Sequence, residues 1–176
     1  VEVNMMYRTG HWRASTRRMG KRLSGKSVAL FGDAIIQGTL SSSLTALGCT
    51  IIHKEEQDTL KNIAIKSDIF ILLPGLSSGL FQSLDYEVIE NIGKEGFLIS
   101  LAGLAPLPVE DILAALNNRT LGGLAIDSYA QYDDVPKALL ELDNIILTPG
   151  IAGSTLEAAE EFGQCVLKTL TDHFAE

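Results

Sequence analysis

The sequence has 176 residues, of which 46% are apolar and 20% charged, the balance of an ordinary globular domain. This composition excludes an intrinsically disordered chain, and no apolar run approaches the about 18 residues of a membrane span. We expect a cytoplasmic protein, because the polar, basic amino terminus has no signal-peptide pattern. Cys49 and Cys165 have neither metal-ligand nor redox spacing, so no metal site is expected.

The net charge of −8 is unevenly distributed along the chain. Residues 1–26 carry seven basic side chains and one acidic side chain, whereas the remainder carries seven basic and 21 acidic ones. We therefore divide the chain into a basic N-terminal arm or connecting segment, residues 1–26, and a domain, residues 27–176. A basic arm can bind nucleic acid, but the acidic domain repels a polyanion. The arm is expected to pack on an acidic face of its own or a neighbouring subunit.

From Ser27 onward, short apolar runs alternate with helical segments, which is typical of a parallel sheet covered on both faces. The expected strands are residues 27–31, 50–53, 69–73, 96–101, 123–126 and 144–147. The expected helices are residues 33–47, 60–65, 84–92 and 108–116, and a last helix capped by Ser154 or Thr155. This order predicts a Rossmann-type, doubly wound α/β domain with about six parallel strands in three layers, α/β/α.

In such a fold, the turn after the first strand binds a pyrophosphate through a G-x-G-x-x-G pattern. Only Gly32 satisfies this pattern, because Ala34 and Gln37 replace the second and third glycines. Asp33 adds a negative charge that works against phosphate binding. The start of the following helix still offers N–H groups to an anion. The candidate cofactor-binding residues of this turn are therefore Gly32, Asp33, Ala34, Ile35 and Ile36.

The acid that binds the cofactor ribose is expected at the end of the second strand, about 20 residues after the glycines. Glu55 follows Gly32 by 23 residues, and it is the candidate for this role. The alternative is an ordinary solvent-exposed acid at a strand end. The missing glycines leave open whether a dinucleotide binds with useful affinity.

Five segments share their order and spacing with the motifs of one family. They read Arg-Thr-Gly-His-Trp at 8–12, Leu-Ser-Gly-Lys-Ser-Val at 23–28, Ser-Asp-Ile at 67–69, Leu-Gly-Gly-Leu-Ala-Ile-Asp at 121–127 and Asn-Ile-Ile-Leu-Thr-Pro-Gly-Ile-Ala-Gly-Ser-Thr at 144–155. Together they resemble the NAD-binding domain of the D-isomer-specific 2-hydroxyacid dehydrogenases. The resemblance implies a Rossmann fold, NAD as cofactor and membership of a family of oxidoreductases that act on 2-hydroxy acids.

The resemblance also aligns three positions with the family's catalytic arginine, glutamate and histidine, which are Gly103, Tyr132 and Gly150 here. Glycine cannot supply the guanidinium that binds a substrate carboxylate, nor a proton carrier, and tyrosine cannot supply the carboxylate that orients a histidine. We therefore assign no catalytic residue. Asp127 matches the family's acid that contacts the nicotinamide carboxamide, although a strand-end aspartate is equally a structural residue.

The favoured hypothesis is a non-catalytic relative, a pseudoenzyme that keeps the fold as a binding or assembly module. One alternative is the cofactor domain of a genuine NAD-dependent oxidoreductase with an atypical site, completed by a substrate domain or a partner chain. Another is a structural dimerisation subunit that binds no nucleotide. The resemblance implies a homodimer formed through the N-terminal arm and Trp12. The alternative is that Trp12 packs against the core of its own domain.

Overall fold

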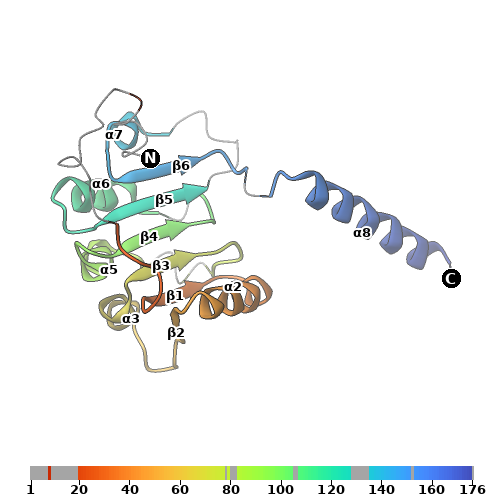
Figure 1. Ribbon diagram of the computed structural model, residues 1–176, viewed down its shortest axis with the longest axis horizontal. Helices are drawn as coiled ribbons and strands as arrows, with labels where there is room; N and C mark the ends of the chain where they lie inside the picture. Colours follow the sequence, from red (N-terminus) through yellow and green to blue (C-terminus); the bar gives the residue numbers. More distant parts are fainter. Residues whose placement is uncertain are drawn as a thin grey trace.

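The computed structural model describes residues 8, 20–77, 79, 83–104, 107–127, 135–151 and 153–175. Within them, one sheet contains the strands β1 (Ser27–Phe31), β2 (Thr50–Ile52), β3 (Ile69–Leu72), β4 (Phe97–Ser100), β5 (Gly123–Asp127) and β6 (Ile145–Thr148). All neighbouring strands are parallel, in the order β2-β1-β3-β4-β5-β6 (Figure 1). The predicted Rossmann-type sheet is confirmed. Its strand order reverses between β1 and β3, the point at which such sheets bind ligands.

The helices are α2 (Ala34–Ala46), α3 (Leu60–Lys66), α5 (Tyr86–Ile92), α6 (Val109–Asn117), α7 (Lys137–Leu140) and α8 (Leu156–Phe174). Pro108 was expected within the first turn of α6, but it is the N-cap and lies just before that turn. Of the two caps expected for α8, Thr155 is the one observed, and it accepts a hydrogen bond from the Ala158 N–H at 3.1 Å. The sequence did not predict α7, because four residues are too few to show a helical period.

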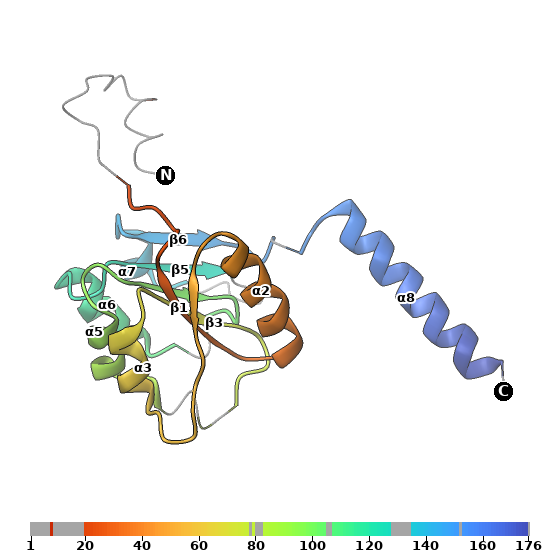
Figure 2. The same ribbon diagram turned by 60° about the horizontal axis from the view of Figure 1, so that its bottom comes forward.

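The two faces of the sheet are covered unequally. On one face, α3, α5, α6 and α7 pack a continuous core around Phe70, Leu98 and Ile112. On the other face, α2 packs a smaller core through Leu44 against alternate side chains of β1 and β3 (Figure 2). Within the described residues no helix covers β4 to β6 on this second face, where an apolar cleft of about 650 Å³ lies beside the exposed Phe97 and Ile146. The described part of the third layer is therefore the single helix α2.

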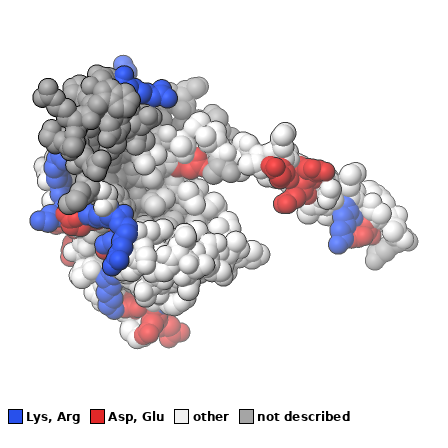
Figure 3. Space-filling view, in the orientation of Figure 1, with Lys and Arg blue, Asp and Glu red and all other residues white. Residues whose placement is uncertain are grey.

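Helix α8 extends away from the sheet (Figures 1 and 2), and none of its residues is buried. Phe162 and Phe174 are 72% and 78% exposed. Figure 3 shows acidic side chains near the start of the helix, where Glu157, Glu160 and Glu161 lie. Because none of its apolar side chains is buried, this helix offers an apolar surface for packing against another surface. Across the described ranges, no helix combines the length and apolar character that a membrane crossing needs.

Two basic residues of the arm pair with acids of the chain's own domain. Lys21 forms an ion pair with Glu95, and the Lys26 ammonium lies 2.6 Å from Asp68 Oδ1. The other Asp68 oxygen accepts hydrogen bonds from the backbone N–H and the hydroxyl of Ser27, each at 2.9 Å. Lys26 and then the Ser27 N–H hold the pKa of Asp68 below its ordinary value. Asp68 thus joins the first residue of β1 to the start of β3.

Replacing Asp68 with asparagine is expected to lower the free energy of unfolding by about 1–2 kcal/mol at pH 7, since it weakens a charge-assisted contact. The folded-state pKa of Asp68 lies below its unfolded value, so the contribution is present above about pH 4 and is lost as the pH falls through the folded-state pKa. Urea unfolding at several pH values measures this. Asp143→Asn is the control: its pair with Arg119 is exposed and 3.9 Å long, so a change under about 0.5 kcal/mol is expected. An Asp68→Asn effect that is equal at pH 7 and pH 3 would contradict the assignment.

Candidate functional site

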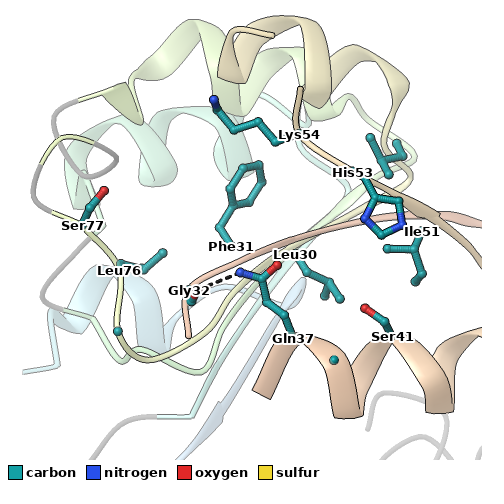
Figure 4. Close-up of a pocket in the computed structure, with 13 residues that line it drawn as sticks. Leu30, Phe31, Gly32, Gln37, Ser41, Ile51, His53, Lys54, Leu76 and Ser77 are labelled. Atoms are coloured by element: carbon teal, nitrogen blue, oxygen red, sulfur yellow. Dashed lines mark hydrogen bonds between the residues drawn. The ribbon is translucent and has the colours of Figure 1, made fainter. Parts of the chain in front are cut away.

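A cleft of about 580 Å³ lies at the carboxyl ends of β1 and β2, beside the loop that follows β3 (Figure 4). The cleft adjoins the reversal point between β1 and β3, and its volume is within the about 300–1,000 Å³ of small-molecule sites. Apolar side chains from β1 and β2 form much of its wall, and the start of α2 and the loop after β3 complete it. The lining residues include Leu30, Phe31, Gly32, Gln37, Ser41, Ile51, His53, Lys54, Leu76 and Ser77.

The turn after β1 packs directly against the loop that follows β3. Gly32 has a φ of +137°, and a Cβ at this position would lie 2.6 Å from the Leu73 carbonyl oxygen and 2.7 Å from that of Pro74. The Asp33 N–H donates to the same Pro74 oxygen at 2.8 Å. Gly32 is therefore required by the close approach of two backbone segments, as its place in the phosphate-loop pattern suggested.

Asp33 is the N-cap of α2. One oxygen of its carboxylate accepts hydrogen bonds from the backbone N–H groups of Ile35 and Ile36, at 2.9 and 3.1 Å. These are donors that the start of α2 would otherwise offer to an anion. A carboxylate of the chain itself therefore lies where the sequence pattern places a pyrophosphate, and it carries the same sign of charge.

Gln37, which replaces the third glycine, also closes this turn. Its amide nitrogen donates to the Gly32 carbonyl oxygen at 2.7 Å, a contact drawn in Figure 4. The side chain thus crosses the turn that a pyrophosphate would have to approach. With Asp33 on the helix N–H groups and Gln37 across the turn, the residues present do not fit a pyrophosphate as they stand.

The end of β2 presents a different set of side chains from the one expected. His53 and Lys54 line the cleft, whereas Glu55 is exposed and outside its lining. The Glu55 carboxylate accepts a hydrogen bond from Gln57 at 2.6 Å, and its N–H donates to Asp58 at 3.1 Å. The ribose-binding role of Glu55 stays a prediction. The sequence analysis missed Lys54, because it looked for an acid at a fixed distance after the glycines. The available signal was a basic residue directly after the expected strand.

At the other end of the sheet, Asp127 joins the ends of β5 and β6. Its Oδ1 accepts hydrogen bonds from the Thr148 hydroxyl at 2.6 Å and from the Gly150 N–H at 2.9 Å. These hydrogen bonds give Asp127 a structural role. Its contact with the nicotinamide of a cofactor stays a prediction. Among the described residues, no group of three or more His, Cys, Asp and Glu could hold a metal ion.

The two glycines at catalytic positions of the resemblance both have positive φ. Gly103 has a φ of +82° and Gly150 a φ of +72°. The Gly103 carbonyl accepts a hydrogen bond from the buried Ser100 hydroxyl at 2.6 Å. Side chains are disfavoured in this backbone conformation, so both positions suit glycine as the chain is folded. The third position, Tyr132, lies outside the described residues.

A parallel six-stranded sheet with a cleft at its switch point defines a Rossmann-type nucleotide-binding-fold domain. The chain belongs to the D-isomer specific 2-hydroxyacid dehydrogenase family: the model of the family's NAD binding domain matches residues 1–152. The family expected from the sequence motifs is therefore confirmed.

Two curated relatives show how much of a family member the chain represents. It is 26% identical to glyoxylate/hydroxypyruvate reductase A of Arabidopsis thaliana, covering 99% of this chain and 59% of the relative. It is 24% identical to 2-ketogluconate reductase of Gluconobacter oxydans, covering 100% of this chain and 60% of the relative. The chain thus spans about three-fifths of the length of these enzymes.

Solved structures agree with the fold. The 2-hydroxyacid dehydrogenase from Ketogulonicigenium vulgare Y25 superposes with a TM-score of 0.83 at 24% identity, over 99% of this chain and 58% of that one. An acyclic imino acid reductase, solved in complex with NADPH and D-Arg, has a TM-score of 0.83 at 18% identity, over 99% of this chain and 59% of that one. At these identities the likeness concerns the fold alone. The family supports a pyridine nucleotide as the cofactor class.

Proposed function

We propose that this chain is a non-catalytic relative of the 2-hydroxyacid dehydrogenases that keeps the Rossmann domain as a binding module. The observation that carries the proposal is the pair Gly103 and Gly150. The resemblance aligns them with the family's arginine and histidine, and their φ values of +82° and +72° disfavour any side chain. Neither a substrate carboxylate anchor nor a proton carrier is available at these two positions.

The surroundings of Gly150 support the same proposal. Its N–H donates to the Asp127 carboxylate, so the turn after β6 is held by a contact that does not depend on a side chain at position 150. The three histidines of the chain, His11, His53 and His173, lie in the arm, at the end of β2 and near the end of α8 in the sequence. None lies on β4, β5 or β6 or in the turn directly after one of them, where the resemblance places the family's catalytic positions. A relocated general acid or base therefore has no candidate histidine on these strands.

The test is a spectrophotometric assay of the chain with NADH or NADPH and three 2-oxo acids: glyoxylate, hydroxypyruvate and 2-ketogluconate. We expect no oxidation of the reduced cofactor above the rate without protein. Gly150→His is expected to add no activity, because the imidazole would lack both a relaxed backbone and an arginine partner. Substrate-dependent turnover by the unmodified chain would overturn the proposal.

A second candidate is the cofactor domain of an atypical oxidoreductase. The observation in its favour is that the match covers 59% of the Arabidopsis reductase. A region equivalent to the unmatched part of that reductase would complete a substrate cleft. Turnover that appears only when a substrate domain or partner chain is added to the assay would favour this candidate.

An assembly role is consistent with the exposed apolar side chains of α8 and of the open sheet face. We keep the homodimer formed through the N-terminal arm as a proposal, and likewise the cytoplasmic location. Trp12 lies outside the described residues, so its contact with a partner stays a prediction. The ion pairs of Lys21 and Lys26 with Glu95 and Asp68 support an arm that packs against its own domain, which leaves nucleic acid as the disfavoured partner.

A further inference from the structure

Helix α8 has an apolar side that is exposed along the length of the helix. Large apolar side chains recur at every fourth residue and therefore share one side. They are Phe162, Val166, Leu170 and Phe174, which are between 40% and 78% exposed. The first two turns also carry Glu157, Glu160 and Glu161, and no ion pair within the described ranges includes any of these three acids. The helix therefore presents an apolar stripe and an acidic start.

The second face of the sheet, over β4 to β6, offers a surface of the matching kind. Its cleft of about 650 Å³ is lined mostly by apolar side chains, including Phe97 and Ile146, which are 41% and 52% exposed. Ala125 on β5 is paired in register with Ile99 on β4 and with Ile146 on β6. A small side chain thus lies between two large ones, and such a trough suits the apolar stripe of a helix.

A basic edge borders this cleft at the amino ends of β3 and β4. Lys21, Arg22 and Lys26 line a pocket that shares Ile69 and Phe97 with the apolar cleft. Lys21 and Lys26 have acidic partners, whereas no ion pair of the described residues includes Arg22, which is exposed. Figure 3 shows Lys and Arg side chains on the side of the domain away from α8. Opposite charges therefore border the apolar cleft and the apolar stripe of α8.

The position of these charges decides which copy of α8 fits the cleft. The Gly150 N–H donates to the Asp127 carboxylate, so the segment that leads to α8 starts at the carboxyl ends of β5 and β6. If α8 turned back onto its own sheet, its acidic start would lie at these carboxyl ends, whereas Arg22 lies at the amino ends. The α8 of a second copy enters from the amino ends, which brings its acidic start to Arg22.

We propose that α8 of one copy docks on the open sheet face of a second copy, over β4 to β6, so that two chains exchange their last helices. Exchange in both directions gives a twofold dimer and doubles the buried area, toward the about 1,200–2,000 Å² of a stable interface. The 19-residue helix is about 28 Å long. Strands of four or five residues are about 13–17 Å long, so the stripe covers the whole cleft. The inference rests on the assembly role in the proposed function and adds a surface that the arm does not provide.

The mass of the chain in solution, measured by light scattering at micromolar concentration, is the first test. We expect twice the mass of one chain. Phe162→Asp on α8 and Ile146→Asp on the open face each place a charge in the apolar contact, so each is expected to weaken the dimer about a hundredfold. Both side chains are at least half exposed, so the variants are expected to keep the fold, which circular dichroism checks. Ile65→Asp is the matched control: Ile65 is 65% exposed on α3, on the other face of the sheet, and its variant is expected to dimerise unchanged.

A charge exchange tests the complementarity of the two borders. Arg22→Glu and Glu160→Arg are each expected to raise the dissociation constant of the dimer about tenfold, because each places like charges together. The double variant is expected to restore the value of the unmodified chain, since the two charges have changed places. A role of either side chain in its own fold alone would not give this rescue.

Disulfide trapping separates helix exchange from a helix that turns back. In a Cys165→Ser background, Cys49 is the only other native cysteine, and it is buried. A tagged chain with Val166→Cys is mixed with an untagged chain with Ile146→Cys, and an oxidant is added. We expect a covalent dimer of one tagged and one untagged chain. Replacing the second chain with one that carries Ile65→Cys is expected to abolish this product.

Several outcomes would overturn the inference. They are a monomer at micromolar concentration, a dimer that Phe162→Asp and Ile146→Asp leave intact, and two charge reversals whose effects add instead of cancelling. A disulfide that forms only within a chain carrying both Val166→Cys and Ile146→Cys would show that α8 turns back, and would also overturn it. A dimer lost only with Trp12→Ala would leave the arm contact of the proposed function without helix exchange. None of these results is turnover with a 2-oxo acid, which is the outcome that overturns the proposed function.

Discussion

Gly32→Ala is expected to lower the free energy of unfolding by about 2–5 kcal/mol, from overpacking and backbone strain together. The new methyl group would lie 2.6 Å from the Leu73 oxygen, 2.7 Å from the Leu73 Cβ and 2.7 Å from the Pro74 oxygen, at a φ of +137°. Leu73 is fully buried, so the loop after β3 cannot move without disturbing the core between α2 and the sheet. A loss of this size is a large share of the about 5–15 kcal/mol that stabilises a typical domain.

Gly38→Ala provides the matched control for this prediction. Gly38 lies in α2, six residues further along the same cleft wall, and a Cβ there would meet nothing within 4 Å. Because alanine is the better helix former, this variant is expected to be up to about 1 kcal/mol more stable than the unmodified chain. Urea unfolding of the three proteins measures the difference. Equal stability of the two variants would show that the turn after β1 does not pack against the loop after β3 as described.

Asp33→Gly is expected to raise the affinity for NADPH about tenfold, because it frees two N–H donors and removes a like charge from the pyrophosphate position. The Ile35 and Ile36 N–H groups, now bonded to the Asp33 carboxylate, would become available to a phosphate. Asp33→Asn keeps an N-cap but removes the charge, so an intermediate affinity is expected. Calorimetric titration of each variant measures these affinities.

Asp33→Gly also removes an N-cap, and this loss lowers the free energy of unfolding. Replacing an N-cap residue costs about 0.5–2 kcal/mol with alanine and only a few tenths with glycine, so the variant needs a control for stability. Thr155→Gly supplies it: Thr155 caps α8, outside the cleft, through the Ala158 N–H. This variant is expected to leave NADPH affinity unaltered. The role of Asp33 is contradicted if Asp33→Gly leaves NADPH affinity as low as in the unmodified chain, while its stability falls as for Thr155→Gly.

The order of strands and helices was accessible from the sequence because the strands of a parallel sheet are buried on both faces. Continuous apolar runs such as Val28-Ala29-Leu30-Phe31 therefore mark them without any alternation. The helices α2, α3, α5, α6 and α8 are long enough to show their period. Two features were not accessible: α7, with four residues, and the open second face of the sheet, which depends on where the helices pack.

The candidate site was predictable in part. The motif placed Gly32 correctly at a tight turn, and the charge of Asp33 indicated a poor phosphate site. Glu55 was selected by its distance along the chain, whereas the side chain that lines the cleft is that of Lys54. Whether a strand-end residue faces the cleft depends on how the chain turns after β2, and spacing in the sequence does not report this.

The sequence by itself determined the Rossmann fold, the family and the identity of Gly103 and Gly150, because apolar periodicity and motif order are properties of neighbouring residues. The tertiary structure decided which donors and charges remain available to a ligand. The Asp33 N–H donates to the Pro74 carbonyl in the loop after the neighbouring strand, and Lys54 and Ser77 line one cleft although they are far apart in the chain. Whether a hydrogen-bond donor is already used depends on such long-range neighbours. Only the folded chain therefore shows that the Ile35 and Ile36 N–H groups are occupied by the Asp33 carboxylate.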